Sequence, residues 1–217
     1  MTINKITSFN EYISLATRTE SANTHPTDVN VLLLTLGIHT LTTEILDGFK
    51  KQIFYGKEEK LQTKTVPALA GISQMVMTMV ELLHGIRQED GTYLATEETG
   101  LHLADELSDR NIRLIHGILG IITESGELGE ILIKHIDDGK VDVTNLQEEL
   151  NDHDWYSAIL HDEFKLDFYQ GLTNNINKLT IRYPEKFDAE LAANRNLDAE
   201  REALEVGISD DVYQQDK

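Results

Sequence analysis

The spacing of apolar residues predicts helices along nearly the whole chain. Over residues 29–55, apolar side chains recur every three or four positions, which is typical of one face of an amphipathic helix: Val31, Leu34, Ile38, Leu41, Ile45 and Phe49. The same spacing predicts further helices, separated by polar or glycine-containing turns, at about 8–18, 110–137, 144–163 and 167–183. With only three prolines and few alternating β-branched runs, the chain has little strand character. We therefore predict an all-α fold.

Local signals place the ends of some of these helices. Ser8 and Asp28 are suitable N-caps, as is Ser108 or Asp109 before the helix at 110–137. A further helix is predicted to begin at Pro67 and to end near residue 83, because proline suits the first helical turn. The preceding "YGKEEKLQTKT" is then a loop, and "HGIRQEDGTY" interrupts the helical pattern after it.

The helical pattern occurs twice. With an offset of 83 residues, "LGIHTLTTEILDGFKKQIFYGK" (36–57) aligns without a gap with "LGIITESGELGEILIKHIDDGK" (119–140), and nine of the 22 positions are identical. Amphipathic periodicity does not explain why Gly-Lys follows the helix in both copies. We therefore predict an internal duplication, with a degenerate helical repeat at 1–85, a second helical domain at 91–190 and a polar, acidic tail at 191–217.

Composition limits the partners of this chain. Nineteen Lys and Arg against 38 Asp and Glu give a net charge of -19, so we expect neither nucleic acid nor an anionic membrane as a partner. An anionic substrate would need a local positive charge, from a metal ion or clustered bases. The chain has no cysteine, no apolar run of about 18 residues and no signal-peptide pattern in "MTINKITSFNEY", so we expect a cytoplasmic location.

Two groups of acidic residues interrupt the amphipathic pattern of the second copy. Glu124 and Glu127 are three residues apart, as are Glu149 and Asp152, so each pair projects from one face of its helix. The short turn around "DDGKVDV" favours antiparallel packing, which lets both pairs face one groove. Four carboxylates at close range repel one another unless a cation lies between them. Oxygen ligands select a hard ion, which predicts Mg²⁺, with Mn²⁺ as a substitute.

Any one of these motifs could instead consist of solvated surface acids. We expect Glu130 and Glu148 either to face solvent or to contact the ligand residues without binding the metal. The first copy lacks the pattern. Leu41 aligns with Glu124, and "VPALAGISQMVM" contains no acid where the second copy has "EELND". The first copy is therefore expected to keep the helical shape without the carboxylates.

The set formed by "ESGE", "EELND" and "WY" resembles the motif of the MazG-like all-α nucleoside triphosphate pyrophosphohydrolases. Downstream, "NNINKLTIRYPEKF" and "NRNLDAERE" are similar to phage and bacterial members, so the resemblance covers about 109–203. It implies that Glu124, Glu127, Glu149 and Asp152 bind Mg²⁺ and are the catalytic residues. It also implies attack of a metal-activated water on the α-phosphorus of a (deoxy)nucleoside triphosphate, giving the monophosphate and pyrophosphate, in a bacterial or phage-infected cytosol.

Other positions suggest substrate contacts or depart from the family pattern. Asn175, Lys178 and Arg182 form a polar and basic stripe on one helix, the helix at which the resemblance places nucleotide contacts; a solvated face is the equal alternative, and Lys134 and Lys140 are weaker candidates. His153 and Asp154 stand where the family usually has apolar residues. Asp154 could pair with a base, join the metal site or mark a changed interface, whereas Trp155 and Tyr156 are expected in the core.

Members of the family usually complete their core by dimerising. The resemblance therefore implies a homo-oligomer or, with the degenerate copy as partner, an intramolecular pseudo-dimer of 1–85 with 91–190. The alternative function is that of a non-catalytic, acidic helical protein that keeps this fold and sequesters a basic partner.

Overall fold

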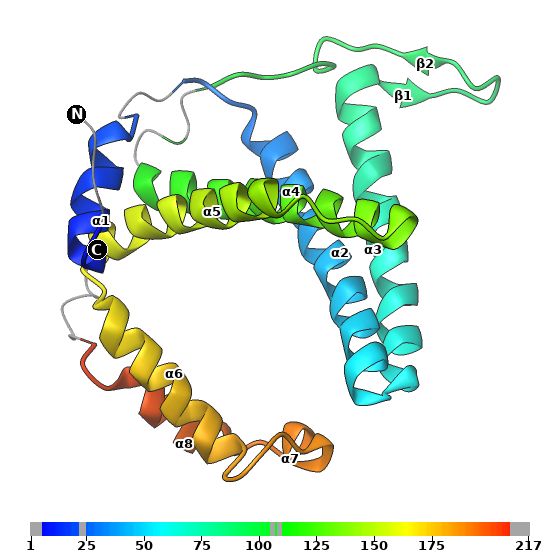
Figure 1. Ribbon diagram of the computed structural model, residues 1–217. Helices are drawn as coiled ribbons and strands as arrows, with labels where there is room; N and C mark the ends of the chain where they lie inside the picture. The colour runs from blue at the N-terminus through cyan, green and yellow to red at the C-terminus, as the bar shows by residue number, and fades with distance from the viewer. Residues whose placement is uncertain (1–5, 22–24, 105–106, 108–109, 209–217) are drawn as a thin grey trace. The chain divides into compact units, whose positions relative to one another are not determined.

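The computed structural model describes residues 6–21, 25–104, 107 and 110–208 (Figure 1). Eight α-helices and one small hairpin form this part of the chain, which confirms the all-α prediction. The helices are α1 (Phe9–Ala16), α2 (Val29–Tyr55), α3 (Glu58–His84), α4 (Ile112–Asp138), α5 (Val143–Glu163), α6 (Phe168–Arg182), α7 (Ala189–Ala193) and α8 (Leu197–Glu205), and a short 3₁₀ turn (Thr17–Thr19) follows α1.

The stretch that interrupts the helical pattern after α3 forms the hairpin. Strands β1 (Ile86–Arg87) and β2 (Tyr93–Leu94) pair antiparallel, with Ile86 opposite Leu94 and Arg87 opposite Tyr93. Both strands are exposed, so the hairpin does not build a core.

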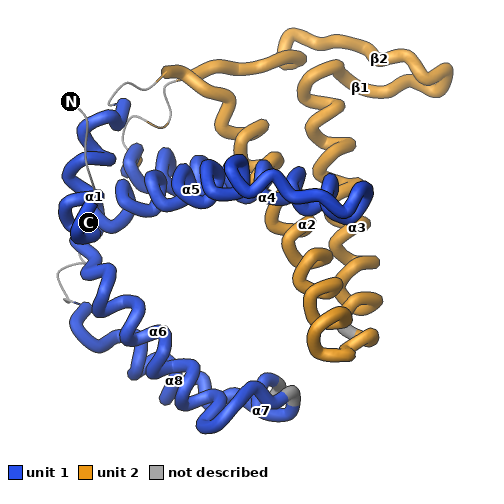
Figure 2. The backbone as a smooth tube through the Cα atoms, in the orientation of Figure 1, with its two compact units in different colours: residues 1–23, 111–217 blue, residues 24–110 orange. Residues whose placement is uncertain are grey.

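The chain divides into two compact units (Figure 2). One contains residues 1–23 together with 111–217, and the other contains residues 24–110. Helix α1 therefore belongs to the unit of α4 and α5, although the sequence repeat groups it with α2 and α3. The predicted repeat boundaries at 85 and 91 concern sequence similarity, whereas the two units are defined by contacts. The boundaries therefore stay a prediction. The end of the predicted tail, 209–217, lies outside the described residues.

The helix ends carry the caps that their sequences favour. The side chains of Ser8 and Asp28 accept hydrogen bonds from the backbone N–H groups three residues later, as predicted. Asn111 caps α4 in the same way, while the predicted caps Ser108 and Asp109 lie outside the described residues.

Helices α2 and α4 match in length and in both ends. Each has 27 residues, begins after a capping Asp28 or Asn111 and ends at a left-handed glycine, Gly56 or Gly139. The same 83-residue offset that aligns the sequences relates both the N-caps and the C-caps. Local structure thus follows the repeat at its helix boundaries, where packing alone would leave the ends free to differ.

The predicted start of α3 is wrong. The helix begins at Glu58, so the expected loop before Pro67 is helical and the proline lies inside the helix. Glu58 and Glu59 in the first turn complement the positive end of the helix dipole. An interior proline costs about 3 kcal/mol because one backbone hydrogen bond is lost. Packing of α3 along the whole of α2 offsets this cost.

Glycines let the helices of each hairpin approach closely. In the first helical hairpin, formed by α2 and α3, Gly37 faces Met75 and Gly71 faces Leu41. In the second, formed by α4 and α5, a methyl group built on Gly120 would lie 2.0 Å from the ring of Tyr156. Gly37 and Gly120 are equivalent under the 83-residue offset. Both hairpins therefore use a small residue at the same position to bring their helices together.

Helices α2 and α3 are also long and apolar enough to meet a length and composition test for membrane spans. Core helices of soluble proteins meet the same test, but they are mostly buried, whereas almost none of the residues in these two apolar windows are buried. The cytoplasmic location therefore stays a prediction.

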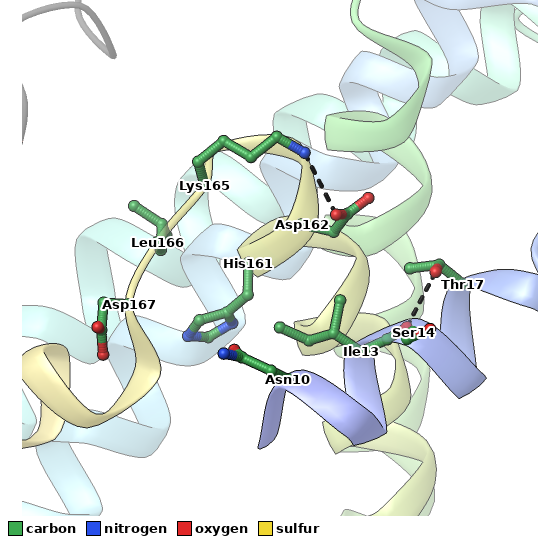
Figure 3. A pocket seen from close by; sticks show the side chains of 9 residues that line it. All are labelled: Asn10, Ile13, Ser14, Thr17, His161, Asp162, Lys165, Leu166 and Asp167. Carbon is green, nitrogen blue, oxygen red and sulfur yellow. Dashed lines mark hydrogen bonds and ion pairs between the residues drawn. The ribbon is translucent and has the colours of Figure 1, made fainter. Parts of the chain in front are cut away.

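Helix α1 packs against α5 and the start of α6. The rings of Phe9 and Phe168 stack with centroids 3.8 Å apart, and the Tyr12 hydroxyl donates to the carbonyl of Asn151 at 3.2 Å. Figure 3 shows His161 of α5 beside Asn10 of α1. These contacts fix the N-terminal helix on the unit that carries the acidic motifs.

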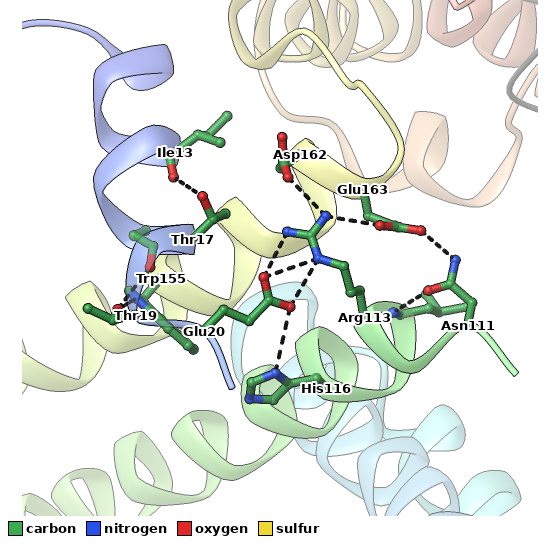
Figure 4. Close-up of polar contacts among 12 residues, drawn as sticks. Ile13, Thr17, Thr19, Glu20, Asn111, Arg113, His116, Trp155, Asp162 and Glu163 are labelled. Carbon is green, nitrogen blue, oxygen red and sulfur yellow. Dashed lines mark hydrogen bonds and ion pairs between the residues drawn. The ribbon is translucent and has the colours of Figure 1, made fainter. Parts of the chain in front are cut away.

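An arginine joins the segment after α1 to α4 and α5 (Figure 4). Arg113, in the first turn of α4, donates to both carboxylate oxygens of Glu20 and forms ion pairs with Asp162 and Glu163 at 2.9 Å. Asn111 donates to Glu163 at 2.9 Å. Hydrogen bonds that Arg113 donates to Glu20 come first among the causes that raise the pKa of Arg113, so the guanidinium stays charged. Three acids from two other segments are thus neutralised by one side chain.

We expect Arg113→Met to lower the free energy of unfolding by about 1.5–3 kcal/mol, because it leaves three half-buried carboxylates without their shared partner. Urea unfolding followed by circular dichroism measures the loss. Lys165→Met is the matched control, since Lys165 is 74% exposed and pairs with the same Asp162; it should cost less than about 0.5 kcal/mol. Equal urea midpoints for the two variants would contradict a structural role for Arg113.

Candidate metal centre

Three of the four predicted carboxylates converge between α4 and α5. Glu124 and Glu127 project from α4 and Glu149 from α5, and one oxygen atom of each lies within 4.8 Å of the other two. Asp152 lies one turn after Glu149 on α5, and its charge acts on both Glu124 and Glu127. The prediction that the two acidic motifs face one another is thus met by these side chains.

The site has a buried side and an open side. Glu124 and Glu149 are only 8% and 7% exposed, whereas Glu127 and Asp152 are exposed. Asn145 donates to Glu149 Oε1 at 2.6 Å, one turn before it on α5, and the hydroxyl of Thr123 lies 3.4 Å from Glu124 Oε1. Two carboxylates are therefore held by the protein, and a third stands where solvent or a ligand can reach it.

The acids disturb one another electrostatically. Burial raises the pKa of Glu124, and the charges of Glu127, Asp152 and Glu149 raise it further. For Glu127 the charge of Glu149 is the largest cause of its raised pKa. In the described residues, Lys and Arg neutralise acids elsewhere, such as Asp47, Glu20 and Glu200. The cluster therefore favours binding either a proton or a cation.

The donor set fits a hard divalent cation. All four candidates offer carboxylate oxygens, which Mg²⁺ and Mn²⁺ accept, and the exposed Glu127 leaves the site open to water or a phosphate group. Two buried ligands that are already in place would lower the entropy lost on binding.

Sequence analysis missed the role of Tyr156, which it placed simply in the core. The ring packs on Gly120 of α4, and burial, followed by the charges of Glu124, Asp152 and Glu127, raises the pKa of its hydroxyl. The phenol therefore keeps its proton beside the carboxylates. Its position four residues after Asp152, on the same helix face, is the signal that could have identified it.

A small cavity lies next to the cluster, at the turn between α4 and α5. It encloses about 270 Å³, and its lining includes Lys134, Lys140 and Asn145. Asn145 also holds Glu149, so it joins the cavity to the carboxylates. The two lysines, predicted only as weak candidates, thus supply positive charge close to the acids, although Asp138 and Asp142 share the lining.

The three predicted substrate contacts all lie on α6, but they have different partners. Lys178 donates to Asn175 at 2.6 Å, so these two form one polar group on an exposed face. Arg182 instead pairs with Glu200 of α8, which is 2% exposed and also binds Arg195. This pairing gives Arg182 a structural role in joining α6 to α8. Nucleotide binding by the three residues stays a prediction, and the ion pair lends it no support at Arg182.

Three further acids lie close to the converging carboxylates in the sequence, and the charge of one, Glu130, contributes to the raised pKa of Glu127. Glu130 and Glu148 are exposed, in agreement with the expected solvated acids. Asp154 is 66% exposed in its side chain, with Oδ1 4.0 Å from Nδ1 of His153, and it lines a different cavity.

No family model, curated protein or solved structure matches this chain. The MazG-like resemblance therefore depends on the motif residues themselves.

We expect Glu124→Gln to raise the melting temperature of the metal-free protein at pH 7.5 by about 2–4 °C, because the amide does not repel the other acids. The pKa of Glu124 lies above its ordinary 4.5 in the folded state, so its protonated form stabilises the fold at low pH and that stability is lost as pH rises through the raised value. The advantage of the variant should therefore vanish as pH falls to 4.5 and below.

Thermal melts with and without Mg²⁺ or Mn²⁺ complete this test. The wild type should gain about 2.7 kcal/mol at a metal concentration one hundred times Kd. Glu124→Gln should lose that gain, while Glu148→Gln, the same change on an exposed neighbour of Glu149, should keep it. An identical metal response in all three proteins would exclude the cluster as the binding site.

Glu200 gives the opposite pH dependence. Hydrogen bonds from Arg182 and then Arg195 lower its pKa from 4.5 to about 2. Its ionised form therefore stabilises the fold above pH 4.5, and this contribution is lost as pH falls toward about 2. We expect Glu200→Gln to lower the urea midpoint at pH 7 and to approach the wild type progressively below pH 4.5. Glu205→Gln on the exposed face of α8 is the control, and a pH-independent deficit of Glu200→Gln would contradict the assignment.

Proposed function

We propose that this chain is a Mg²⁺-dependent nucleoside triphosphate pyrophosphohydrolase of the MazG-like group. Its substrate would be a (deoxy)nucleoside triphosphate and its products the monophosphate and pyrophosphate. The observation that carries the proposal is the convergence of Glu124, Glu127 and Glu149 from two helices, with Asp152 acting on the first two. The motif resemblance supports the same reaction.

The four acids would have different tasks. Glu124 and Glu149 are buried and would hold Mg²⁺ in a fixed position, while Glu127 and Asp152 would complete the ligand set from the exposed side. When bound, Mg²⁺ would neutralise phosphate oxygens and lower the pKa of a water molecule. In the proposed hydrolysis, the oxygen of water would bond to the α-phosphorus. The bond from that phosphorus to the oxygen bridging it to the β-phosphorus would break, and pyrophosphate would leave with that oxygen.

Groups around the acids would meet the phosphates. Lys134 and Lys140 line the adjoining cavity, where they balance Asp138 and Asp142, and they would be the nearest described lysines to turn toward a phosphate group there. Tyr156 keeps its proton and could donate a hydrogen bond to an anionic oxygen. These contacts would favour a polyphosphate over a single phosphate group.

The α2–α3 hairpin lacks the acidic ligands, which favours one metal site per chain rather than two. Leu41 occupies the position equivalent to Glu124, and its side chain packs over Gly71 of α3. A side chain in that place serves helix packing and offers no ligand atom. We therefore expect metal to bind at one site per chain, the one between α4 and α5.

The test is pyrophosphate release from each common dNTP and NTP, with and without Mg²⁺. We expect Mg²⁺-dependent turnover that falls at least about 100-fold in Glu127→Gln and in Asp152→Asn, a loss of about 2.7 kcal/mol in transition-state stabilisation. Both residues are exposed, so the substitutions should leave the fold intact. Glu148→Gln should retain activity.

Absence of turnover across the panel, in protein that binds Mg²⁺, would exclude the enzymatic proposal. It would favour the alternative in which the acidic fold sequesters a basic partner, and that binding would weaken steeply with salt. Release of orthophosphate in place of pyrophosphate would also contradict the proposal, since it requires cleavage at a different phosphorus.

A further inference from the structure

A second cavity lies between α1, α5 and the start of α6. It is wide open to solvent, and its volume of about 630 Å³ is within the range of small-molecule sites. Four aromatic side chains form most of its apolar lining: Phe9, Tyr12, Phe168 and Tyr169. From α5 it receives Asn151 and Asp154.

The cavity is separate from the carboxylate cluster. Asn151 and Asp154 are three residues apart and follow Glu149 by two and five positions, so at 100° per residue they project from the opposite side of α5. The two sites therefore share a helix but not a face. This position also accounts for Asp154, the residue that departs from the apolar family pattern: it replaces a packing side chain on the face that lines the cavity.

The charge of the cavity is negative. Asp154 is the one charged residue among the described residues that line it. The Nδ1 atom of His153 lies 4.0 Å from Asp154 Oδ1. Burial raises the pKa of Tyr12, and the charges of Asp154 and Asp152 raise it further, as a negative local potential requires.

A neighbouring cavity gives the contrast. It lies on the other side of α1, and Figure 3 shows Lys165 paired with Asp162 there, at 3.3 Å. Its lysine therefore already has a carboxylate partner, and a second one, Asp167, lines the same cavity. The cavity with Asp154 has no lysine or arginine in its described lining, and the contact of its carboxylate with His153 is long, at 4.0 Å, so a cationic ligand can approach the carboxylate.

The aromatic rings are fixed by contacts with one another. Phe9 stacks on Phe168 with centroids 3.8 Å apart, and Tyr12 and Tyr169 lie 5.8 and 5.5 Å from Phe9 and Phe168, respectively. The hydroxyl of Tyr12 is held by the carbonyl of Asn151. Ring faces attract cations, and the attraction grows when a carboxylate stands beside them.

We propose that this cavity binds an organic cation, with the ammonium or guanidinium group between Asp154 and the aromatic rings. Such a group can come from a small metabolite or from a basic side chain of a polypeptide, and both carry the same recognition chemistry. A neutral ligand of the same shape would lose both the ion pair and the cation–π attraction.

The test uses the full chain and two pairs of matched probes, with binding followed by NMR titration. The first pair is choline and its neutral isostere 3,3-dimethylbutan-1-ol; the second is the capped peptide Gly-Gly-Arg-Gly-Gly and its citrulline counterpart. We expect the cationic member of a pair to bind at least about tenfold more tightly than the neutral one. Preference for choline would identify a small-molecule site, and preference for the arginine peptide a polypeptide site.

Two variants locate the binding. Asp154→Asn should weaken the cationic probe about tenfold without changing the neutral one, and Tyr169→Leu, at a residue 59% exposed, should weaken it severalfold. Asp137→Asn, an exposed acid at the end of α4, controls for loss of surface charge. Equal binding of charged and neutral probes, unchanged affinity in Asp154→Asn, or no binding of either cation at 50 mM would overturn the proposal. None of these outcomes depends on nucleotide hydrolysis.

Discussion

The close approach of α4 and α5 is the constraint on which the carboxylate cluster depends. Gly117 faces Leu160, and Gly120 leaves room for the ring of Tyr156, so no Cβ atom separates the two helices at these points. Carboxylates from both helices can meet only because this spacing is short. The glycines therefore contribute to the site although neither has a functional group, and the interhelical contact that stabilises the hairpin also sets the distance between its ligands.

The helical hairpins α2–α3 and α4–α5 show how one helical frame can carry an apolar side chain in one case and an acidic one in the other. Helices α2 and α4 share their caps, their length and an equivalent glycine. At one inward position they differ: Leu41 fills the space above Gly71, whereas Glu124 carries a buried carboxylate. A half-buried leucine stabilises its hairpin, whereas a buried acid among other acids destabilises its own while it stays charged. With respect to stability alone, leucine is therefore the more favourable residue at this position.

Local signals in the sequence were sufficient for the helices and for the site on them. Apolar spacing predicted α2, α4 and α5 to within two residues at each end. The predicted cap Asp28 begins α2, whereas Asn111, the cap of α4, was not predicted. Three-residue spacing correctly indicated that Glu124, Glu127 and Glu149 lie together. The failures concern interactions distant in sequence. Pro67 looked like a helix start because the packing that tolerates an interior proline comes from another helix. The partner of Arg182 could not be foreseen either, since Glu200 lies on α8 and nothing in the intervening sequence specifies how that helix returns to α6.

The described carboxylates show three ways of carrying negative charge in an acidic protein. Asp47 is held among lysines and Glu200 between two arginines, and the pKa of each is lowered, so these acids stabilise the fold at neutral pH. Most other acids are exposed and solvated. Glu124 and Glu127 belong to neither group, because their pKa values are raised and their nearest charged neighbours are further acids. In the described residues, Asp47 and Glu200 have lysine or arginine partners and the backbone holds the buried Asp28, whereas Glu124 and Glu127 repel one another and their acidic neighbours. Binding of a proton or of a divalent cation would relieve that repulsion.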